Sequence, residues 1–292
     1  MIDAAILNRL AARLAAALAT PSVTLHRFVV DGAAVGEIAA ERAERLREFG
    51  DVFVVDGREV RLAPTLVGPE ARTAAILEVT RALAQEGALT AWRDERYAVA
   101  ASLDAPPLFH LERAAARYFG VATYAVHVNG LTTLPDGREA MWIARRSPRK
   151  SIDPGLLDNM VGGGIAAGSS VRGTLVKEAR EEAGLDEATV SRARPTGTVH
   201  IHRLQADGVQ RETLFVHDLS LPPQVVPRNE DGEVVAFRLA SLEEVAWIAG
   251  TTEGPEVATA DAAAVMADWL VRRGVTPRDW NDSVAATLRP RE

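Results

Sequence analysis

Residues 162–185 read GGGIAAGSSVRGTLVKEAREEAGL, a glycine-rich segment that runs directly into an acidic one. This pattern predicts a tight loop followed by a single helix. On a helix of about 3.6 residues per turn, Glu178, Glu181 and Glu182 share one face. Carboxylates that lie this close raise one another's pKa values unless a cation lies among them. Magnesium and manganese prefer carboxylate oxygens, so we expect the three glutamates to hold such a hard divalent cation.

The same stretch resembles the signature of the Nudix hydrolases, which combines glycines, an arginine and glutamates at fixed spacings. Gly163 corresponds to the opening glycine, Gly184 to the closing glycine and Leu185 to the last aliphatic residue. The three glutamates occupy the positions of the family's helix carboxylates. The resemblance therefore implies a metal-dependent hydrolase that cleaves a phosphoanhydride.

Two positions depart from that signature. Ser169 stands where the family has its first glutamate, and Lys177 stands where it has arginine. Lysine keeps the positive charge but lacks the planar fork that orients a carboxylate through two hydrogen bonds. We expect weaker positioning of the catalytic carboxylates, and the two changes also favour an alternative in which the domain is a catalytically weak ligand sensor.

The segments around the signature are similar to the thiamine-diphosphate-related branch of the Nudix family. Members of this branch carry an extra N-terminal domain and also occur fused to thiamine pyrophosphokinase. The resemblance implies an α/β (α+β) protein, in which a Nudix α/β/α sandwich with a mixed sheet follows a small α+β domain. The similar segments are residues 127–130, 142–147, 154–159, 215–219 and 229–233.

The resemblance also assigns roles to individual residues. It implies that Glu178 and Glu182 bind the metal, with Glu181 as a further ligand or as the base for the attacking water. Lys177 would orient one of these carboxylates, so the expected catalytic residues are Glu181, Glu178 and Lys177. Family members often place one more carboxylate outside the signature, and Glu230 is the expected extra metal ligand, with Glu233 as the alternative.

Substrate contacts are expected from the strand and loop that precede the helix. Arg145 and Arg146 are adjacent on a predicted strand, so they point to opposite faces and at most one of them reaches a bound phosphate. Asn159 is expected near the glycine loop, where its side chain can brace the backbone. Gly163 and Gly164 allow the backbone to approach the substrate closely.

The implied substrate is a small-molecule diphosphate linked to a group X, and the resemblance implies thiamine diphosphate or an oxidised analogue. A nucleotide-sugar or dinucleotide pyrophosphatase of the ADP-ribose or NADH type is the alternative within the same enzyme class. An aromatic ring in X calls for aromatic contacts, and Trp142, Tyr124 and Phe215 are available in this part of the chain, unless they belong to the core.

Composition narrows the choice of compartment and partner. A formal net charge of -7 argues against a nucleic-acid surface, and no segment is apolar enough to predict a membrane span. With no cysteine, the chain has no thiol nucleophile, which weighs against the isomerase branch of the same fold. We expect a cytoplasmic enzyme, and the sequence leaves open whether it forms a homodimer.

The 292 residues are expected to form two domains. The predicted divisions are an N-terminal α+β domain at 1–120, the catalytic domain at 121–275 and a polar tail at 276–292, with a hinge at Pro106-Pro107. Asp-Gly pairs at residues 31–32 and 56–57 predict two hairpins in the first domain. Residues 149–168 are expected to form one long loop. Helices are expected at 6–18, ended by Pro21, and at 39–49, 71–86, 109–119 and 260–273.

Overall fold

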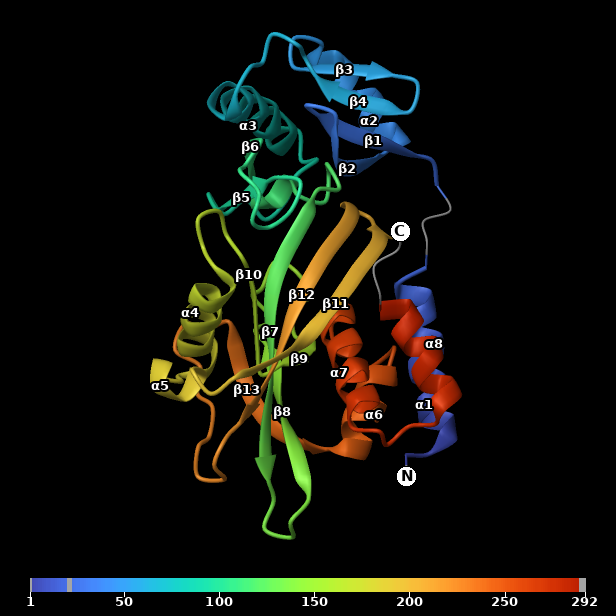
Figure 1. The fold of residues 1–292 in the computed structure, drawn as a ribbon, viewed down its shortest axis with the longest axis vertical. Coiled ribbons are helices and arrows are strands. Elements are labelled where there is room, and N and C mark those ends of the chain that lie inside the picture. The colour runs from blue at the N-terminus through green and yellow to red at the C-terminus, as the bar shows by residue number, and fades with distance from the viewer. Residues whose placement is uncertain (1, 20–22, 289–292) are drawn as a thin grey trace.

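The computed structural model describes residues 2–19 and 23–288. It shows a small α+β domain stacked on one end of a larger sandwich of helices and sheet, which matches the expected fold class (Figure 1). Pro21, expected to end the first helix, lies outside the described residues. In the part of the chain that is described, no helix combines the length and apolar character needed to cross a membrane.

The smaller domain is built on a four-stranded sheet with the order β2-β1-β4-β3. Both predicted Asp-Gly hairpins are confirmed, because β1 pairs with β2 and β3 pairs with β4 in antiparallel register. A separate antiparallel pair, β5 and β6, lies against α3. The elements are β1 (Leu25–Val30), β2 (Ala33–Ala39), α2 (Ala40–Leu46), η1 (Arg47–Phe49), β3 (Phe53–Asp56), β4 (Glu59–Leu62), α3 (Pro69–Gln85), β5 (Arg96–Val99), β6 (Phe109–Glu112) and η2 (Arg113–Ala115).

The larger domain is built on a seven-stranded mixed sheet. Its main path is β11-β12-β7-β8-β13, with β10 paired to β7 and β9 paired to β8. The pairing of β12 with β7 is parallel, while the other pairings are antiparallel. The strands are β7 (Ala122–Thr133), β8 (Glu139–Arg146), β9 (Leu157–Asn159), β10 (Val161–Gly164), β11 (Arg194–Gln205), β12 (Gly208–Ser220) and β13 (Val234–Ser241).

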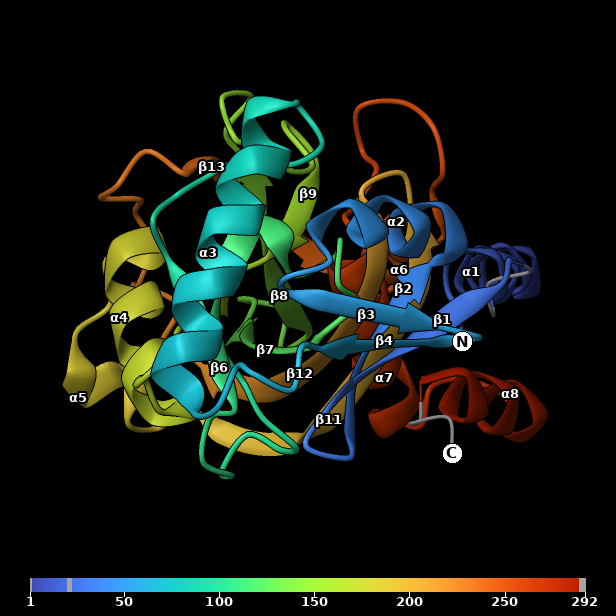
Figure 2. The same ribbon diagram turned by 90° about the horizontal axis from the view of Figure 1, so that it is seen from above.

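Helices cover both faces of this sheet (Figures 1 and 2). Alternate residues of β7 point to opposite faces, so Ala125 joins one buried core while Val126 and Val128 join the other. The first core includes α1, α6, α7 and α8, and the second includes α4. The helices are α1 (Ala4–Ala17), α4 (Val171–Ala183), α5 (Glu187–Val190), α6 (Leu242–Gly250), α7 (Ala260–Arg272) and α8 (Arg278–Leu288).

The ends of the chain differ from the predicted plan. Residues 278–288 form helix α8, so the prediction of a polar tail is wrong for this segment. Trp280, Val284 and Leu288 recur at four-residue steps and are buried with α1. Helix α1 packs against α6, α7 and α8, although it belongs by sequence to the predicted first domain. Apolar faces at the two ends of the chain cover each other.

Two further predictions about local structure are wrong. The predicted helix at 109–119 is strand β6 followed by the short helix η2, because Phe109 and Leu111 alternate toward the core and pair with β5. Pro106-Pro107 consequently lies in the connection between β5 and β6. The predicted loop at 149–168 contains β9 and β10, which extend the sheet by pairing with β8 and β7, respectively. These strands are too short to show a periodic pattern.

Candidate active site

Helix α4 carries the acidic cluster beside strand β10. The helix begins after Ser170, whose hydroxyl accepts a hydrogen bond from Gly173 N at 3.0 Å. It ends at Gly184, which has a left-handed φ of 63°. Strand β10 pairs with β7 on one side and contacts α4 through its glycines. The residues expected to form a glycine loop are therefore a fixed strand next to the acidic helix.

Glu182 is the most deeply buried of the helix glutamates, at 5% exposure. Its Oε2 accepts a hydrogen bond from Gly162 N at 2.9 Å, and its Oε1 lies 3.7 Å from Lys150 Nζ. Burial raises the pKa of Glu182 to about 8, although the contacts with Gly162 and Lys150 favour the charged form. The carboxylate is thus held in a fixed place with only part of its charge compensated.

Glu178 lies directly against Gly163. A Cβ atom on Gly163 would be 2.4 Å from Cγ and Cδ of Glu178, so no other residue fits at this position without moving the carboxylate. Burial raises the pKa of Glu178, while Lys177 lowers it. The ammonium of Lys177 lies 2.9 Å from Glu178 Oε1 and 3.2 Å from Glu181 Oε2. Lys177 therefore links the two glutamates from the solvent side.

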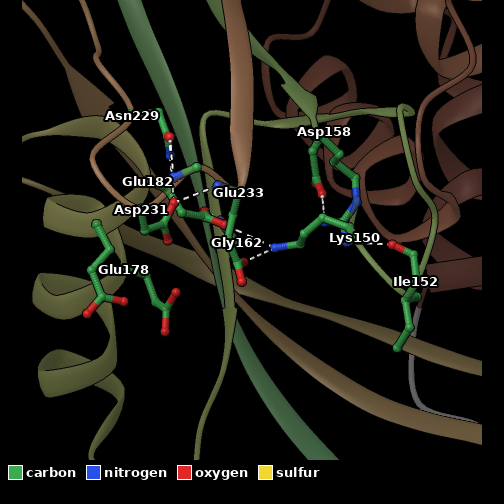
Figure 3. A network of polar contacts seen from close by, with 12 residues as sticks. Lys150, Ile152, Asp158, Gly162, Glu178, Glu182, Asn229, Asp231 and Glu233 are labelled. Atoms are coloured by element: carbon green, nitrogen blue, oxygen red, sulfur yellow. Dashed lines mark hydrogen bonds and ion pairs between the residues drawn. The ribbon is translucent and has the colours of Figure 1, made fainter. Parts of the chain in front are cut away.

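A second lysine, Lys150, comes from the connection between β8 and β9 and is mostly buried. It contacts the carboxylate of Glu233 as well as that of Glu182, which joins the acidic helix to the residues before β13 (Figure 3). Arg93 from the smaller domain lies 3.3 Å from the other oxygen of Glu233. Lys150 thus bridges two carboxylates at the centre of the network and compensates part of their charge.

The predicted extra ligand, Glu230, is placed differently from Glu233. Its side chain is exposed and lies near Gly184 at the end of α4, while its backbone N donates to Glu181 O at 2.9 Å. Glu233 is turned toward Lys150 and lines a cavity. The structure therefore brings the alternative carboxylate, rather than Glu230, to the network.

The donor set fits a hard divalent cation. Among the described residues, no three His, Asp or Glu side chains gather closely enough to form a ready metal site. However, Glu178 and Glu182 both present carboxylate oxygens at one end of β10, and burial raises the pKa of each. Positive charge near them comes from Lys177 and Lys150. A divalent cation that binds here would compensate the negative charge of the two carboxylates, and their oxygen atoms are the ligands that it prefers.

A cavity opens in front of this network, between the two domains. The strand β10 glycines form part of its wall, together with basic and acidic residues from both domains. Among the lining residues that bear on chemistry are Arg93, Tyr97, Arg113, Arg117, His127, Arg146, Lys150, Asp158, Gly162, Gly163, Gly164, Gln210, Glu212, Glu233 and Asp261.

Comparison with known proteins identifies the larger domain. A family model described as the NUDIX domain matches residues 123–261. Nudix hydrolase 20, chloroplastic, of Arabidopsis thaliana is 40% identical over 257 residues, which cover 85% of this chain and 67% of that protein. The chain belongs to the Nudix hydrolase family. It is a pyrophosphatase-type hydrolase, and Nudix enzymes generally use divalent metals.

The chain is also similar to other proteins. Nudix hydrolase 24, chloroplastic, of Arabidopsis thaliana is 40% identical over 250 residues, covering 85% of this chain and 67% of that protein. A crystal structure of DR0079 from Deinococcus radiodurans shares 23% identity and a TM-score of 0.44, covering 59% of this chain and 97% of that one. Residues 9–123 match a family described as a domain of unknown function, DUF4743.

The two adjacent arginines of the Nudix domain have different surroundings. Arg146 lines the cavity, and its Nη1 donates to Asp158 Oδ2 at 2.8 Å. Arg145 instead donates to the carbonyl oxygen of Pro255 at 2.7 Å and pairs with Glu256 at 2.7 Å. Of the two candidates, Arg146 is thus the one placed to reach a substrate.

The side chain of Asn159 forms hydrogen bonds inside the Nudix domain and does not line the cavity. Its Oδ1 lies 2.8 Å from Nδ1 of His127, and its Nδ2 donates to Asn129 Oδ1 at 3.1 Å. The side chain is 1% exposed. Since adjacent strand residues alternate, Asp158 lines the cavity while Asn159 points away from it. The predicted contact of Asn159 with substrate is not supported by this geometry, and its role is to fix the strands.

A second cluster of polar side chains lines the cavity away from the acidic helix, and it was not predicted from the sequence. Gln210 Nε2 donates to Glu212 Oε2 at 2.8 Å and to Asp261 Oδ2 at 3.1 Å. Burial raises the pKa of Glu212, and the nearby Asp261 raises it further. No sequence motif contains these residues, because β12 and α7 meet only in the folded domain.

Proposed function

We propose that this Nudix enzyme hydrolyses the phosphoanhydride bond of an organic diphosphate with Mg²⁺ or Mn²⁺, releasing an organic monophosphate and phosphate. One observation carries the proposal. The buried carboxylates of Glu178 and Glu182 contact Gly163 and Gly162, and these glycines line a cavity together with Lys150 and Arg146. Clustered carboxylates select a divalent cation, while the lysine and the arginine favour phosphate oxygens.

The chain's own residues have distinct tasks in this reaction. Gly162 fixes Glu182 through its N–H, and Gly163 leaves room for Glu178. Lys150 holds Glu182 in place until the substrate arrives, then offers its ammonium to a phosphate oxygen. A glutamate of α4, Glu181 or Glu178, accepts the proton of the attacking water. A bound divalent cation would neutralise the negative charge that develops on the diphosphate during the reaction.

We further propose that the organic group is thiamine or an oxidised analogue of it. The segments that flank the Nudix signature support this choice by their similarity to the thiamine-related branch. The aromatic residues considered from the sequence do not provide the ring contact. Trp142 is buried in the core, and Tyr124 stacks on Phe215 with ring centroids 6.4 Å apart. Tyr97 of the smaller domain lines the cavity instead.

Phosphate release tests both parts of the proposal, with alkaline phosphatase added for ADP-ribose and NADH, because cleavage of these two compounds yields two organic monophosphates and no free phosphate. Wild type is assayed with Mg²⁺ or Mn²⁺ on thiamine diphosphate, oxidised thiamine diphosphates, ADP-ribose, NADH and nucleoside diphosphates. Glu182→Gln is expected to be inactive, and Glu187→Gln is the matched control, since Glu187 is exposed on α5 and pairs with Arg172.

The panel separates the candidate functions. Release from thiamine-type substrates that Glu182→Gln abolishes and Glu187→Gln retains supports the full proposal. Mutation-sensitive activity confined to nucleotide substrates keeps the chemistry and rejects thiamine. If the folded protein releases nothing, the hydrolase proposal fails and the ligand-sensor alternative replaces it.

A further inference from the structure

The cavity extends from the acidic helix to the smaller domain along strand β7. Residues His127, Ala125 and Thr123 alternate along β7 and all line it. His127 is opposite Gly162 in the strand pairing, and Thr123 is opposite Glu212. Four residues of strand span about 13 Å. The site therefore has a catalytic end beside Gly162 and a far end beside Glu212, separated by roughly the length of a small heterocycle and its linker.

The smaller domain forms one wall of the far end. Tyr97 comes from β5 and Arg113 from η2, and both line the cavity. The hydroxyl of Tyr97 is so close to Gly164 that a Cβ atom there would lie 2.5 Å from it. Arg113 is held by Glu95, with Nη1 and Oε2 2.7 Å apart. This wall continues the surface that the β10 glycines begin.

The wall is fixed to the Nudix domain by contacts on both sides of the cavity. Ala167 N donates to Arg96 O at 2.8 Å, and Val209 N donates to Arg117 O at 2.8 Å. The side chain of Arg117 also pairs with Asp207 at 3.2 Å. Because the contacts involve backbone as well as side chains, Tyr97 and Arg113 keep a defined position relative to the catalytic end.

The opposite side of the far end is rich in hydrogen-bond acceptors. The two carboxylates of Glu212 and Asp261 share the single amide nitrogen of Gln210. Oδ1 of Asp261 is buried without a hydrogen-bond partner and lies 3.8 Å from Nη2 of Arg203. Buried acceptors are costly when they are left unpaired. A ligand group that donates N–H hydrogen bonds fits the carboxylates of Glu212 and Asp261, which line this end of the cavity.

We propose that the domain of unknown function completes the substrate site of the enzyme. Its Tyr97 and Arg113 line the same cavity as Gln210, Glu212 and Asp261. Together they recognise the organic group as a nitrogen heterocycle that donates hydrogen bonds to the carboxylates and accepts one from Arg113. This inference rests on the proposed function, in which the diphosphate binds beside Gly162 and Gly163. The smaller domain thus selects the substrate, and the Nudix domain cleaves it.

The test compares substrates that share the diphosphate and differ in the ring. Thiamine diphosphate and ADP carry amino-substituted heterocycles, whereas methyl diphosphate carries none. We expect Arg113→Met and Glu212→Gln to raise KM for the ring-bearing substrate by about tenfold or more, with kcat changed little. Turnover of methyl diphosphate stays within about twofold of wild type. Arg27→Met is the control, since Arg27 is exposed on the same domain and pairs with Glu59.

Two results would overturn the inference. An equal loss on methyl diphosphate and on the ring-bearing substrates places these residues in catalysis or in folding rather than in ring recognition. If Glu212→Gln and a folded Arg113→Met variant both keep the wild-type KM for the ring-bearing substrates, the far end is not part of the substrate site. Glu212→Gln conserves the shape of the side chain and can still accept the hydrogen bond from Gln210. It therefore tests ring recognition even if Arg113→Met does not fold.

Binding measurements separate failure of this inference from failure of the proposed hydrolase. Calorimetry with thiamine monophosphate and with AMP needs no turnover. If wild type cleaves no diphosphate but binds one of these probes about tenfold more tightly than Glu212→Gln does, the hydrolase proposal fails and the far-end site stands. If wild type binds neither probe and hydrolyses no ring-bearing substrate, the far-end site is rejected as well.

Discussion

Glu182→Gln provides a test of the buried carboxylate that does not depend on knowing the substrate. Burial raises the pKa of Glu182 to about 8, whereas a glutamate in the unfolded chain titrates near about 4.3. Between these values the folded protein holds a proton that the unfolded chain has lost. Stability therefore falls as pH rises through this window, and it levels off above the folded pKa.

The magnitude follows from the same two values. Between pH 6 and pH 9, a shift of this size removes about 3 kcal/mol from the free energy of unfolding. Glutamine stays neutral and can still accept the hydrogen bond from Gly162, so Glu182→Gln lacks this loss. Titrating groups far from Glu182 act equally in both proteins, so the difference between the two pH profiles reports Glu182 together with the neighbours whose charges act on it, Lys150, Asp158 and Glu178.

Urea unfolding in EDTA at pH 6, 7, 8 and 9 measures this difference. Glu181→Gln is the matched control, because Glu181 lies on the same helix with a side chain that is 43% exposed. The free energy of unfolding of Glu181→Gln should change with pH in parallel with that of wild type. If Glu182→Gln also runs parallel to wild type between pH 6 and 9, the reasoning about the buried carboxylate is refuted.

Three further changes test the site and the fold. Gly163→Ala places a Cβ atom 2.4 Å from Glu178, so metal-dependent phosphate release should fall by about 100-fold with an unchanged circular dichroism spectrum; activity within threefold of wild type contradicts this. Lys177→Arg restores the guanidinium fork and should raise kcat by roughly threefold, whereas an unchanged or lower kcat shows that the ammonium positions the carboxylates equally well. Trp280→Ala removes a buried side chain whose Nε1 donates to Leu7 O at 2.9 Å, and should cost about 3–5 kcal/mol in urea unfolding. A cost below about 1 kcal/mol would mean that α8 contributes little to the core.

Local signals in the sequence were sufficient where the structure depends on neighbouring residues. The Asp-Gly pairs indicate both hairpins of the smaller domain. In the first, Asp31 and Gly32 adopt positive φ values of 49° and 81°, as a two-residue turn requires, and in the second Gly57 has a φ of 54°. The helix of the Nudix signature is likewise bounded by its own residues, with Ser170 capping one end and Gly184 the other. These features need no distant contacts.

Local signals failed where pairing with a distant segment decides the conformation. Residues 157–164 read as a glycine-rich loop, yet β9 and β10 are extended because β8 and β7 provide hydrogen-bond partners. The segment after Pro107 resembles a helix in composition, but pairing of β6 with β5 makes its first residues a strand. Helix α8 is specified by its packing on α1, at the other end of the chain.

The sequence by itself determined the Nudix chemistry of this protein. The spacing of Glu178, Glu181 and Glu182 along one helix fixes their common face, and helical geometry is a local property. Only the tertiary structure decided which other groups join them. Lys150 and Glu233 reach the cluster from separate loops, and Arg113 reaches the cavity from the other domain. Such contacts depend on the packing of whole elements, and no spacing along the chain encodes them.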